Sequence, residues 1–248
     1  MKLTVVGCSG SFPGPGSAAS CYLVEADGFR VLLDLGNGAL GELQRYVGIY
    51  DIDAVLISHL HPDHYMDLCG YYVARKYRPA GPAPRIPVYG PEDIAQRTAC
   101  AYDLPVDPGM TEEFCFSNYG SEPFVLGPLR VVTELMNHPI PAYGIRLEHD
   151  GHALTYSGDT ASCDALQRLA KGADLFLCEA SFHEGRDTIP DIHLNGREAA
   201  EAAREAGAQR LVLTHIPPWN DPARTLAEAA PAYDGPTDLA KPGRSYEL

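Results

Sequence analysis

Residues 58–64 read Ser58-His59-Leu60-His61-Pro62-Asp63-His64, and these four side chains able to bind a metal within six positions are the most informative feature of the chain. The stretch follows Ala54-Val-Leu-Ile, an apolar run typical of a buried strand, so its polar side chains lie where a strand ends and a loop begins. His59 and His61 alternate, and an extended backbone points both imidazoles to the same side. Asp63 and His64 follow a proline and can turn toward a second point nearby. The segment therefore predicts two neighbouring metal positions, although a solvated polar loop is the alternative.

Further metal ligands are expected at the ends of other strands. Zinc binds histidine nitrogen and carboxylate oxygen at ~2.0–2.2 Å, and two hydrolytic metals ~3.5–4 Å apart need a bridging ligand and more histidines. His138 follows the extended-looking segment 131–137, Asp159 follows a strand that ends in a glycine turn, and His215 ends the apolar segment 210–214. Because all three occupy the C-terminal tips of predicted strands, we expect their side chains to converge on one edge of a sheet.

The order of these residues resembles the metallo-β-lactamase superfamily, and the His-x-His-x-Asp-His cluster is specific for it. More narrowly, the chain resembles the ribonuclease Z-like branch of metal-dependent phosphodiesterases nearly end to end. Similar segments are the first strand with its glycine loop and four later blocks: 3–13, 32–38, 157–160, 177–182 and 193–200. The block that begins at His193, with alanines at helical spacing behind it, is the more specific pointer to this branch.

The resemblance implies two sets of three metal ligands and one shared ligand: His59, His61 and His138 on one metal, Asp63, His64 and His215 on the other, and Asp159 bridging them. The expected cofactors are two divalent metal ions. Zinc is the default, and manganese or iron also suits a site of imidazoles and carboxylates.

The resemblance also implies catalytic residues. His193 matches a histidine beside the scissile phosphate that binds no metal, Glu179 matches a carboxylate near it, and Asp63 belongs to the catalytic set as a ligand. Asn195 can cap a helix, so His193 would lie just before a helix N-terminus, where backbone N–H groups favour an anion. The alternative for His193 is a surface-loop histidine. Asp34 ends a strand and is expected either behind a ligand histidine or as a strand-capping carboxylate.

The expected function is phosphodiester hydrolysis by a metal-bridging hydroxide, with a small phosphodiester such as a cyclic nucleotide as the substrate. The alternatives are ribonuclease Z-type 3′ processing of RNA, and hydrolysis of a lactone or a thioester by the same metals. A β-lactamase of this superfamily would carry Cys where Asp159 stands, and a di-iron oxygen-reducing enzyme would carry Glu where His61 stands. A non-enzymatic metal-binding scaffold is expected to lack a ligand, and none of the seven is missing.

Two departures from the tRNA-processing enzymes argue against a long nucleic acid as the substrate. The interval 139–158 is long enough for one hairpin only, so the tRNA-gripping arm is absent, and His215 is followed by Ile-Pro-Pro-Trp219 instead of a basic and aromatic pattern. The formal net charge is −14, whereas proteins that bind several phosphates normally carry a basic stripe. The one loose basic cluster comprises Arg75, Lys76, Arg78 and Arg85. A homodimer could still contribute an RNA-binding surface from its second subunit.

The chain of 248 residues is 45% hydrophobic, which suits one domain over residues 1–248. The pattern predicts an α/β fold, a four-layer αββα sandwich. Strands are expected at about 2–6, 20–26, 30–34, 54–58, 86–89, 123–126, 129–135, 143–148, 153–157, 174–178 and 211–214. Helices are expected at about 38–46, 64–76, 91–102, 162–170, 196–206 and 222–229.

The sequence predicts a cytoplasmic protein with no membrane segment. The residues after Met1 are broken too soon by Gly7 to form a secretory signal, and no apolar stretch is long enough to cross a bilayer. The seven cysteines are scattered, odd in number and without a C-x-x-C pair, which is typical of reduced thiols.

Overall fold

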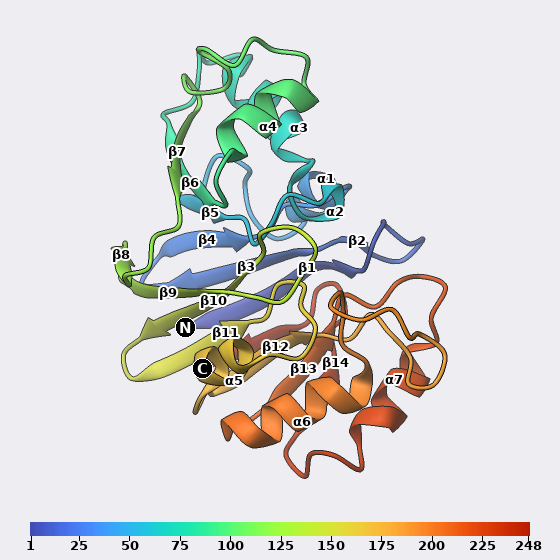
Figure 1. Ribbon diagram of the computed structural model, residues 1–248. Helices are drawn as coiled ribbons and strands as arrows, with labels where there is room; N and C mark the ends of the chain where they lie inside the picture. The colour runs from blue at the N-terminus through green and yellow to red at the C-terminus, as the bar shows by residue number, and fades with distance from the viewer.

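Two β-sheets face each other in the middle of the molecule, and helices cover their outer sides (Figure 1). The computed structural model describes residues 1–248. The first sheet has the order β15-β1-β3-β4-β5-β6-β7, with β2 paired to β1. Its strands are β1 (Lys2–Ser9), β2 (Ala18–Ala19), β3 (Cys21–Ala26), β4 (Phe29–Leu33), β5 (Ala54–Leu56), β6 (Ile86–Gly90), β7 (Phe114–Asn118) and β15 (Ser245–Glu247).

The second sheet has the order β14-β13-β12-β11-β10-β9-β8. Its strands are β8 (Phe124–Leu126), β9 (Leu129–Leu135), β10 (Tyr143–His149), β11 (His152–Tyr156), β12 (Leu175–Glu179), β13 (Leu211–Thr214) and β14 (Thr237–Leu239). The helices are α1 (Ala39–Leu43), α2 (Pro62–Tyr65), α3 (Leu68–Lys76), α4 (Ile94–Ala101), α5 (Asp164–Ala170), α6 (Gly196–Ala206) and α7 (Pro222–Ala229).

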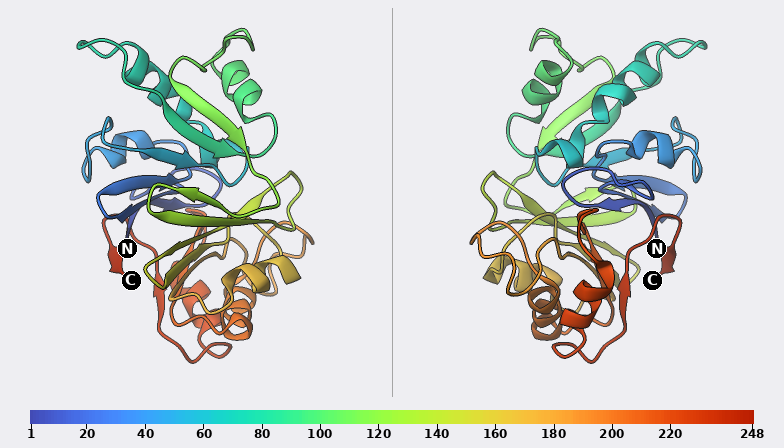
Figure 2. Two further views of the ribbon diagram at one scale, coloured as in Figure 1. Left: turned by 90° about the vertical axis from the view of Figure 1, so that its left-hand side faces the viewer. Right: turned by 90° about the vertical axis from the view of Figure 1, so that its right-hand side faces the viewer.

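The alternation of side chains along the strands builds four layers. In β4, Val31 and Leu33 belong to the apolar cluster between the sheets, whereas Leu32 belongs to the cluster under α1, α3 and α4. In β12, Leu177 faces the other sheet and Phe176 packs in the cluster that includes residues of α5, α6 and α7. Figure 2 shows the two groups of helices on opposite outer sides. The predicted αββα sandwich is therefore confirmed.

Strand direction brings the loops with the predicted site residues to one edge. Strand β9, which precedes His138, pairs antiparallel with β10, as β11 does, and therefore runs in the same direction as β11. Strands β4, β5, β6 and β7 pair in parallel in one sheet, and β11, β12, β13 and β14 do so in the other. The carboxyl ends of parallel strands meet at the same edge, which is where α/β proteins place their ligand sites. The terminal strand β15 closes the first sheet by pairing with β1, so Met1 and Leu248 lie side by side.

The predicted helix 64–76 is two helices, and this difference has a local cause. The carbonyl of His64 accepts a hydrogen bond from the N–H of Leu35 (2.8 Å), and the N–H of Asp67 donates to the carbonyl of Leu35 (3.1 Å). These bonds to the loop after β4 replace helical ones, so α2 ends at Tyr65 and α3 begins at Leu68. The break holds the segment that carries Asp63 and His64 against the sheet.

Four short strands, β2, β7, β14 and β15, were not expected from the sequence; each has two to five residues. The predicted hairpin between His138 and Asp159 is confirmed. Its strands β10 and β11 are joined at Asp150–Gly151, and both residues have a positive φ, as tight hairpin turns require. None of the helices has the length and apolar character needed to cross a membrane.

A pair of glycine variants tests how closely the strand-end loops pack. A Cβ on Gly36 would lie 1.9 Å from the carbonyl oxygen of Asp63, whereas a Cβ on Gly41 would meet nothing within 4 Å. We expect Gly36→Ala to lower the free energy of unfolding by about 1–3 kcal/mol through overpacking. Gly41→Ala lies in α1 and should be neutral or stabilise by up to about 1 kcal/mol. Denaturant unfolding measures both; equal stabilities would contradict the packing described.

Candidate metal centre

Four loops bring the seven predicted ligands together at the carboxyl edge of the two sheets. The loop after β5 and helix α2 carry His59, His61, Asp63 and His64. The loops after β9, β11 and β13 carry His138, Asp159 and His215. Their donor atoms form His/Asp clusters whose members lie within 4.8 Å of one another. Sequence positions more than 150 residues apart thus meet in one site.

The first cluster is made by His59, His61 and His138. Nε2 of His59 lies 3.0 Å from Nδ1 of His61, and Nε2 of His138 lies 3.2 Å from that same Nδ1. Ligand atoms around a tetrahedral zinc ion bonded at ~2.0–2.2 Å are roughly 3.3–3.6 Å apart. The three nitrogens are therefore close to the spacing of a metal site.

The second cluster is made by Asp63, His64 and His215. Oδ2 of Asp63 lies 3.5 Å from Nε2 of His64 and 3.7 Å from Nε2 of His215. All three side chains are buried. These separations also match roughly the edge of a tetrahedral site.

Asp159 touches both clusters. Its Oδ2 lies 3.6 Å from Nε2 of His59 and 3.2 Å from Nε2 of His215, and its Oδ1 lies 3.4 Å from Nε2 of His64. Oδ1 of Asp159 and Nε2 of His64 are buried and have no hydrogen-bond partner. Buried polar atoms are costly when unpaired, so these two atoms point to a cation between them, and the donor set fits divalent metal ions.

Asp34 holds His64 from behind. Its Oδ2 accepts hydrogen bonds from Nδ1 of His64 (2.7 Å), from the hydroxyl of Tyr156 (2.7 Å) and from Oγ of Ser58 (2.8 Å). The backbone N–H of Ser58 donates to its other oxygen (2.6 Å). With Nδ1 protonated toward Asp34, the lone pair of Nε2 is directed at the cluster. Asp34 thus lies behind His64, one of the predicted ligands.

Three other histidines have a similar support. Nδ1 of His59 lies 3.0 Å from Oγ of Ser58, Nδ1 of His138 lies 2.9 Å from the carbonyl oxygen of Ile192, and Nδ1 of His215 lies 2.9 Å from Oγ of Ser20. In each case Nε2 is left to face the site. His215 itself has a φ of 55°, a backbone conformation that non-glycine residues seldom adopt and that recurs at functional sites.

Electrostatics set the protonation state of the ligands. Burial lowers the pKa values of His59, His61 and His138 below the usual histidine value, so neutral imidazoles are favoured. Burial alone would raise the pKa of Asp159, but His215 and His64 hold it well below its usual value. Neutral imidazoles and an ionised carboxylate are the forms that bind metals.

His64 behaves differently, for a reason that also concerns a cation. Burial opposes its charged form, but the carboxylates of Asp159, Asp34 and Asp63 outweigh burial and raise the pKa of His64 well above its usual value. A positive charge is therefore favoured among these carboxylates. A bound metal ion would satisfy the same preference.

His193 lies beside the two clusters and is anchored by Glu179. Its Nδ1 lies 2.8 Å from Oε1 of Glu179, which is fully buried. The N–H groups of Thr160 (2.8 Å) and Ser181 (3.1 Å) donate to the same carboxylate and fix its orientation. Burial opposes the charged imidazole, but Glu179 prevails and raises the pKa of His193 to about 9. His193 also falls within 4.8 Å of Asp159 in a third His/Asp group.

The helix after His193 begins as the sequence predicted. Asn195 is the N-cap of α6 and forms a capping box with Glu198. The supporting residues Ser20, Ser58 and Tyr156 were not predicted, because a serine or tyrosine in or next to an apolar strand gives no signal of its own. His183 joins none of the clusters; it is buried with its Nδ1 3.4 Å from Oε1 of Glu228.

Comparison with known proteins agrees with this geometry. A family described as "Beta-lactamase superfamily domain" matches residues 29–216, which is more than half of the chain. The chain belongs to the beta-lactamase superfamily. The family resemblance of the His/Asp cluster is thereby confirmed.

Members of the superfamily from several bacteria are similar to this one along their full length. "Uncharacterized protein ML1173" from Mycobacterium leprae is 42% identical over 100% of this chain and 89% of its own. "Probable metallo-hydrolase YhfI" from Bacillus subtilis is 31% identical, with 100% of both chains covered. Its crystal structure superposes with a TM-score of 0.89, covering 100% of this chain and 99% of that one.

One further relative and one solved structure extend the comparison. A ribonuclease Z from Myxococcus xanthus is 29% identical over 100% of this chain and 98% of its own. The structure of a diphosphatase from the PhnP family has a TM-score of 0.79 at 21% identity, covering 100% of this chain and 97% of that one, and shows the shared fold.

Metal analysis of the purified protein tests the site. We expect about two divalent ions per chain in the wild type. Asp159→Ala should lose the pairing of the ions, because Asp159 is the carboxylate whose oxygens contact histidines of both clusters. Asp34→Asn should weaken metal affinity by roughly 10–100-fold. Elemental analysis and metal titration measure this, with circular dichroism to verify folding. Less than about one ion in wild-type protein, even after zinc or manganese is added, would contradict the assignment.

Proposed function

We propose that this protein is a dinuclear metal-dependent phosphodiesterase that acts on a small phosphodiester, such as a cyclic nucleotide. Its broader description, a metallo-hydrolase of the beta-lactamase superfamily, rests on the family match and on the His/Asp clusters. The observation that carries the finer proposal is the arrangement of two clusters around Asp159 with an anchored histidine, His193, at their side.

The ligand residues and the metals have distinct parts in this proposal. His59, His61 and His138 would hold one ion, and Asp63, His64 and His215 would hold the other, with Asp159 shared. When bound, two such ions lower the pKa of water toward neutrality and offset the charge of the phosphate. Zinc is the ion expected by default.

His193 is placed to act on the leaving group. With Nδ1 engaged by Glu179, the other ring nitrogen is free to donate a proton or a hydrogen bond. The pKa of about 9 for His193 makes it a proton donor at neutral pH, and repulsion from bound cations would bring that pKa down. Glu179 fixes the tautomer and the orientation of the ring, because Thr160 and Ser181 in turn fix Glu179.

Surface charge supports a small substrate over a folded RNA. In the basic cluster that the sequence contains, Arg75 is buried, and Nζ of Lys76 pairs with Glu112 (3.4 Å) and Glu113 (3.7 Å). The guanidinium of Arg78 lies over the ring of Tyr50. Arg85 is exposed, with Nη1 3.3 Å from the carbonyl oxygen of Thr111, so the cluster offers little basic surface beyond Arg85 and Arg78. The hairpin β10–β11 is too short to serve as an arm that holds RNA.

The relatives' names agree with chemistry at a phosphate but leave the substrate open. A ribonuclease Z and a diphosphatase both act on phosphorus–oxygen bonds. Lactone and thioester hydrolysis remain the alternatives for the same clusters, and a metal-binding scaffold is the alternative without catalysis. A screen of the metal-loaded protein against bis-p-nitrophenyl phosphate, cyclic nucleotides, short RNA, lactones and thioesters distinguishes them.

Replacing His193 separates metal binding from proton transfer. We expect His193→Ala to keep both metals and to lose about 10²–10⁴-fold in kcat, the usual contribution of a positioned acid–base group. The matched control is His152→Ala, since His152 is exposed at the start of β11. Kinetics on an aryl phosphodiester and elemental analysis are the measurements. Loss of metal from His193→Ala would make His193 a ligand, and an unchanged rate would remove it from catalysis.

The salt dependence of the rate tests substrate size. Because several lysines and arginines are normally needed to bind a long nucleic acid, its affinity falls steeply with salt. We expect hydrolysis of a cyclic nucleotide or an aryl diester to change little between about 50 and 200 mM salt, and precursor tRNA to be cut poorly. Efficient 3′ trimming of precursor tRNA, with a steep decrease in rate as salt rises, would instead identify a ribonuclease Z-type enzyme.

A further inference from the structure

Two exposed aromatic side chains project from loops next to the metal centre. Phe12 lies in the loop between β1 and β2 and is 40% exposed, and Trp219 lies between β13 and α7 and is 62% exposed. Their ring centroids are 4.9 Å apart and their planes are inclined by 45°. The rings therefore form an open wedge and not a closed stack. Scattered exposed apolar residues are common and carry no function by themselves. A function for this pair must therefore be argued from the residues around it.

The loop that carries Phe12 is tied to the metal ligand His215. Ser9 forms a bridge with Ile216, and the N–H of Gly10 donates to the carbonyl oxygen of Ile216 (3.2 Å). A Cβ on Gly10 would lie 2.3 Å from the carbonyl oxygen of His215, so the two backbones are in direct contact. Phe12 follows Gly10 by only two residues. The aromatic pair is thus built onto the segment that positions a ligand.

Both aromatic residues are presented by rigid turns. The N–H of Phe12 donates to the carbonyl oxygen of Gly10 (2.7 Å) around Ser11, whose φ is 63°. Such a turn is strained in a residue other than glycine, and strain of this kind gathers at ligand sites.

Trp219 lies in a four-residue turn closed by the N–H of Asn220 and the carbonyl oxygen of Pro217 (2.9 Å). The side chain of Asn220 anchors this turn by donating to the carbonyl oxygen of Ser181 (2.7 Å). Two prolines, Pro217 and Pro218, stiffen it further. Trp219 is therefore held in solvent by a fixed backbone.

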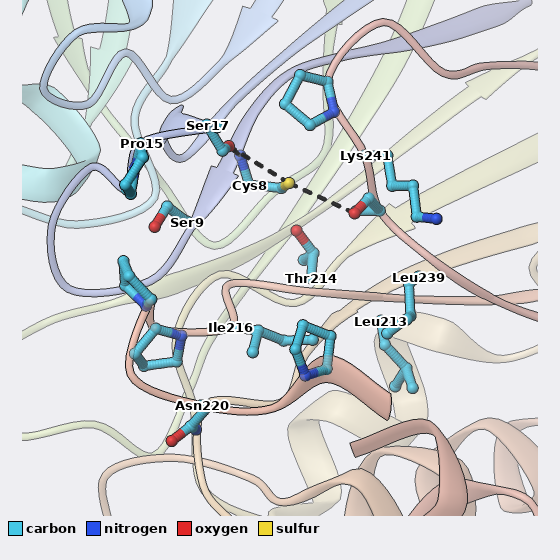
Figure 3. Close-up of a pocket in the computed structure, with 17 residues that line it drawn as sticks. Cys8, Ser9, Pro15, Ser17, Leu213, Thr214, Ile216, Asn220, Leu239 and Lys241 are labelled. Atoms are coloured by element: carbon cyan, nitrogen blue, oxygen red, sulfur yellow. Dashed lines mark hydrogen bonds between the residues drawn. The ribbon is translucent and has the colours of Figure 1, made fainter. Parts of the chain in front are cut away.

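The two segments that carry the aromatic pair have no charged residue. Segments 9–17 and 216–220 contain no Lys, Arg, Asp or Glu, although the chain as a whole has a net charge of −14. Figure 3 shows Ser9, Pro15 and Ser17 of the first segment facing Ile216 and Asn220 of the second across a pocket of about 340 Å³. Lys241 is the one charged residue among those that line this pocket, so a phosphate would find a single cation there. The aromatic pair beside it offers an exposed ring surface to a planar group.

We propose that Phe12 and Trp219 form a stacking platform for the nucleobase of a nucleotide substrate. The inference rests on the proposed phosphodiesterase function, since the phosphate would be held at the metal centre while the base lies against the pair. Bases stack on aromatic side chains with little dependence on sequence, because every base has a π-face. The platform would thus favour nucleotide diesters over diesters without a base.

Two chromogenic diesters isolate the contribution of the base. Thymidine 5′-(p-nitrophenyl phosphate) and methyl p-nitrophenyl phosphate release the same leaving group, and only the first carries a base. We expect the wild type to prefer the nucleoside ester. Trp219→Ala should reduce the ratio of the two kcat/KM values roughly 5- to 100-fold, mainly through KM, and Trp219→Phe should retain most of the preference. The matched control is Tyr77→Ala, an aromatic residue that is 66% exposed beyond α3.

Binding is measured independently by fluorescence, because Trp219 is the single tryptophan of the chain. Adding adenosine 5′-monophosphate to the metal-loaded protein should quench its emission in a saturable manner. Phe12→Ala should weaken this binding, and Tyr77→Ala should not.

The outcomes separate the two proposals. If neither ester is hydrolysed, the phosphodiesterase assignment fails. In that case saturable quenching of Trp219 by the nucleotide still supports the platform, and no quenching rejects it. If both esters are hydrolysed with no preference that depends on Trp219, and emission is unchanged by the nucleotide, the platform is overturned and the enzyme assignment stands. If sedimentation shows that Trp219→Ala converts a dimer to a monomer, the pair is a subunit contact and the platform is likewise overturned.

Discussion

The buried carboxylate of Asp159 is the group on which the rest of the site depends. It lies within 3.6 Å of imidazole nitrogens from both clusters, and one of its oxygens has no partner in the protein. An ionised carboxylate in such a place is costly unless a positive charge is next to it. The neighbouring histidines do not all supply that charge, because burial favours the neutral form of His59 and His61. The site is therefore organised to receive cations.

The fold serves this arrangement by directing four strand ends to one edge. The loops after β5, β11 and β13 follow parallel strands, and β9 runs in the same direction as β11 because both pair antiparallel with β10. Buried carboxylates at those strand ends then orient the histidines through hydrogen bonds. Asp34 accepts hydrogen bonds from His64, Ser58 and Tyr156, and Glu179 accepts one from His193. Such hydrogen bonds limit the rotation of the imidazoles. The binding of a metal or a substrate therefore costs little side-chain conformational entropy.

The residues that would bind the metals and those that would select the substrate lie on different parts of the fold. The residues of the His/Asp clusters come from the strand ends, whereas the features on which the proposed substrate size rests come from loops and surface. The short β10–β11 hairpin and the engaged basic side chains, such as Lys76 with Glu112, give a long polyanion little to bind. Phe12 and Trp219 lie on segments without charged residues, next to the segment of His215. Under the proposed function, these features would favour compact, base-containing diesters.

The amino-acid sequence by itself determined the sandwich and all seven residues of the His/Asp clusters, because strand periodicity and ligand chemistry are local and their order is characteristic of the family. It also located the hairpin at Asp150–Gly151 and the capped start of α6, since turns and caps depend on neighbouring residues. Only the tertiary structure decided the break between α2 and α3, which depends on hydrogen bonds to Leu35. It alone placed Ser20, Ser58 and Tyr156 behind the ligands and brought Phe12 to Trp219. These contacts join residues distant in sequence, and a pairing that exists only after the chain has folded leaves no periodic signal along it.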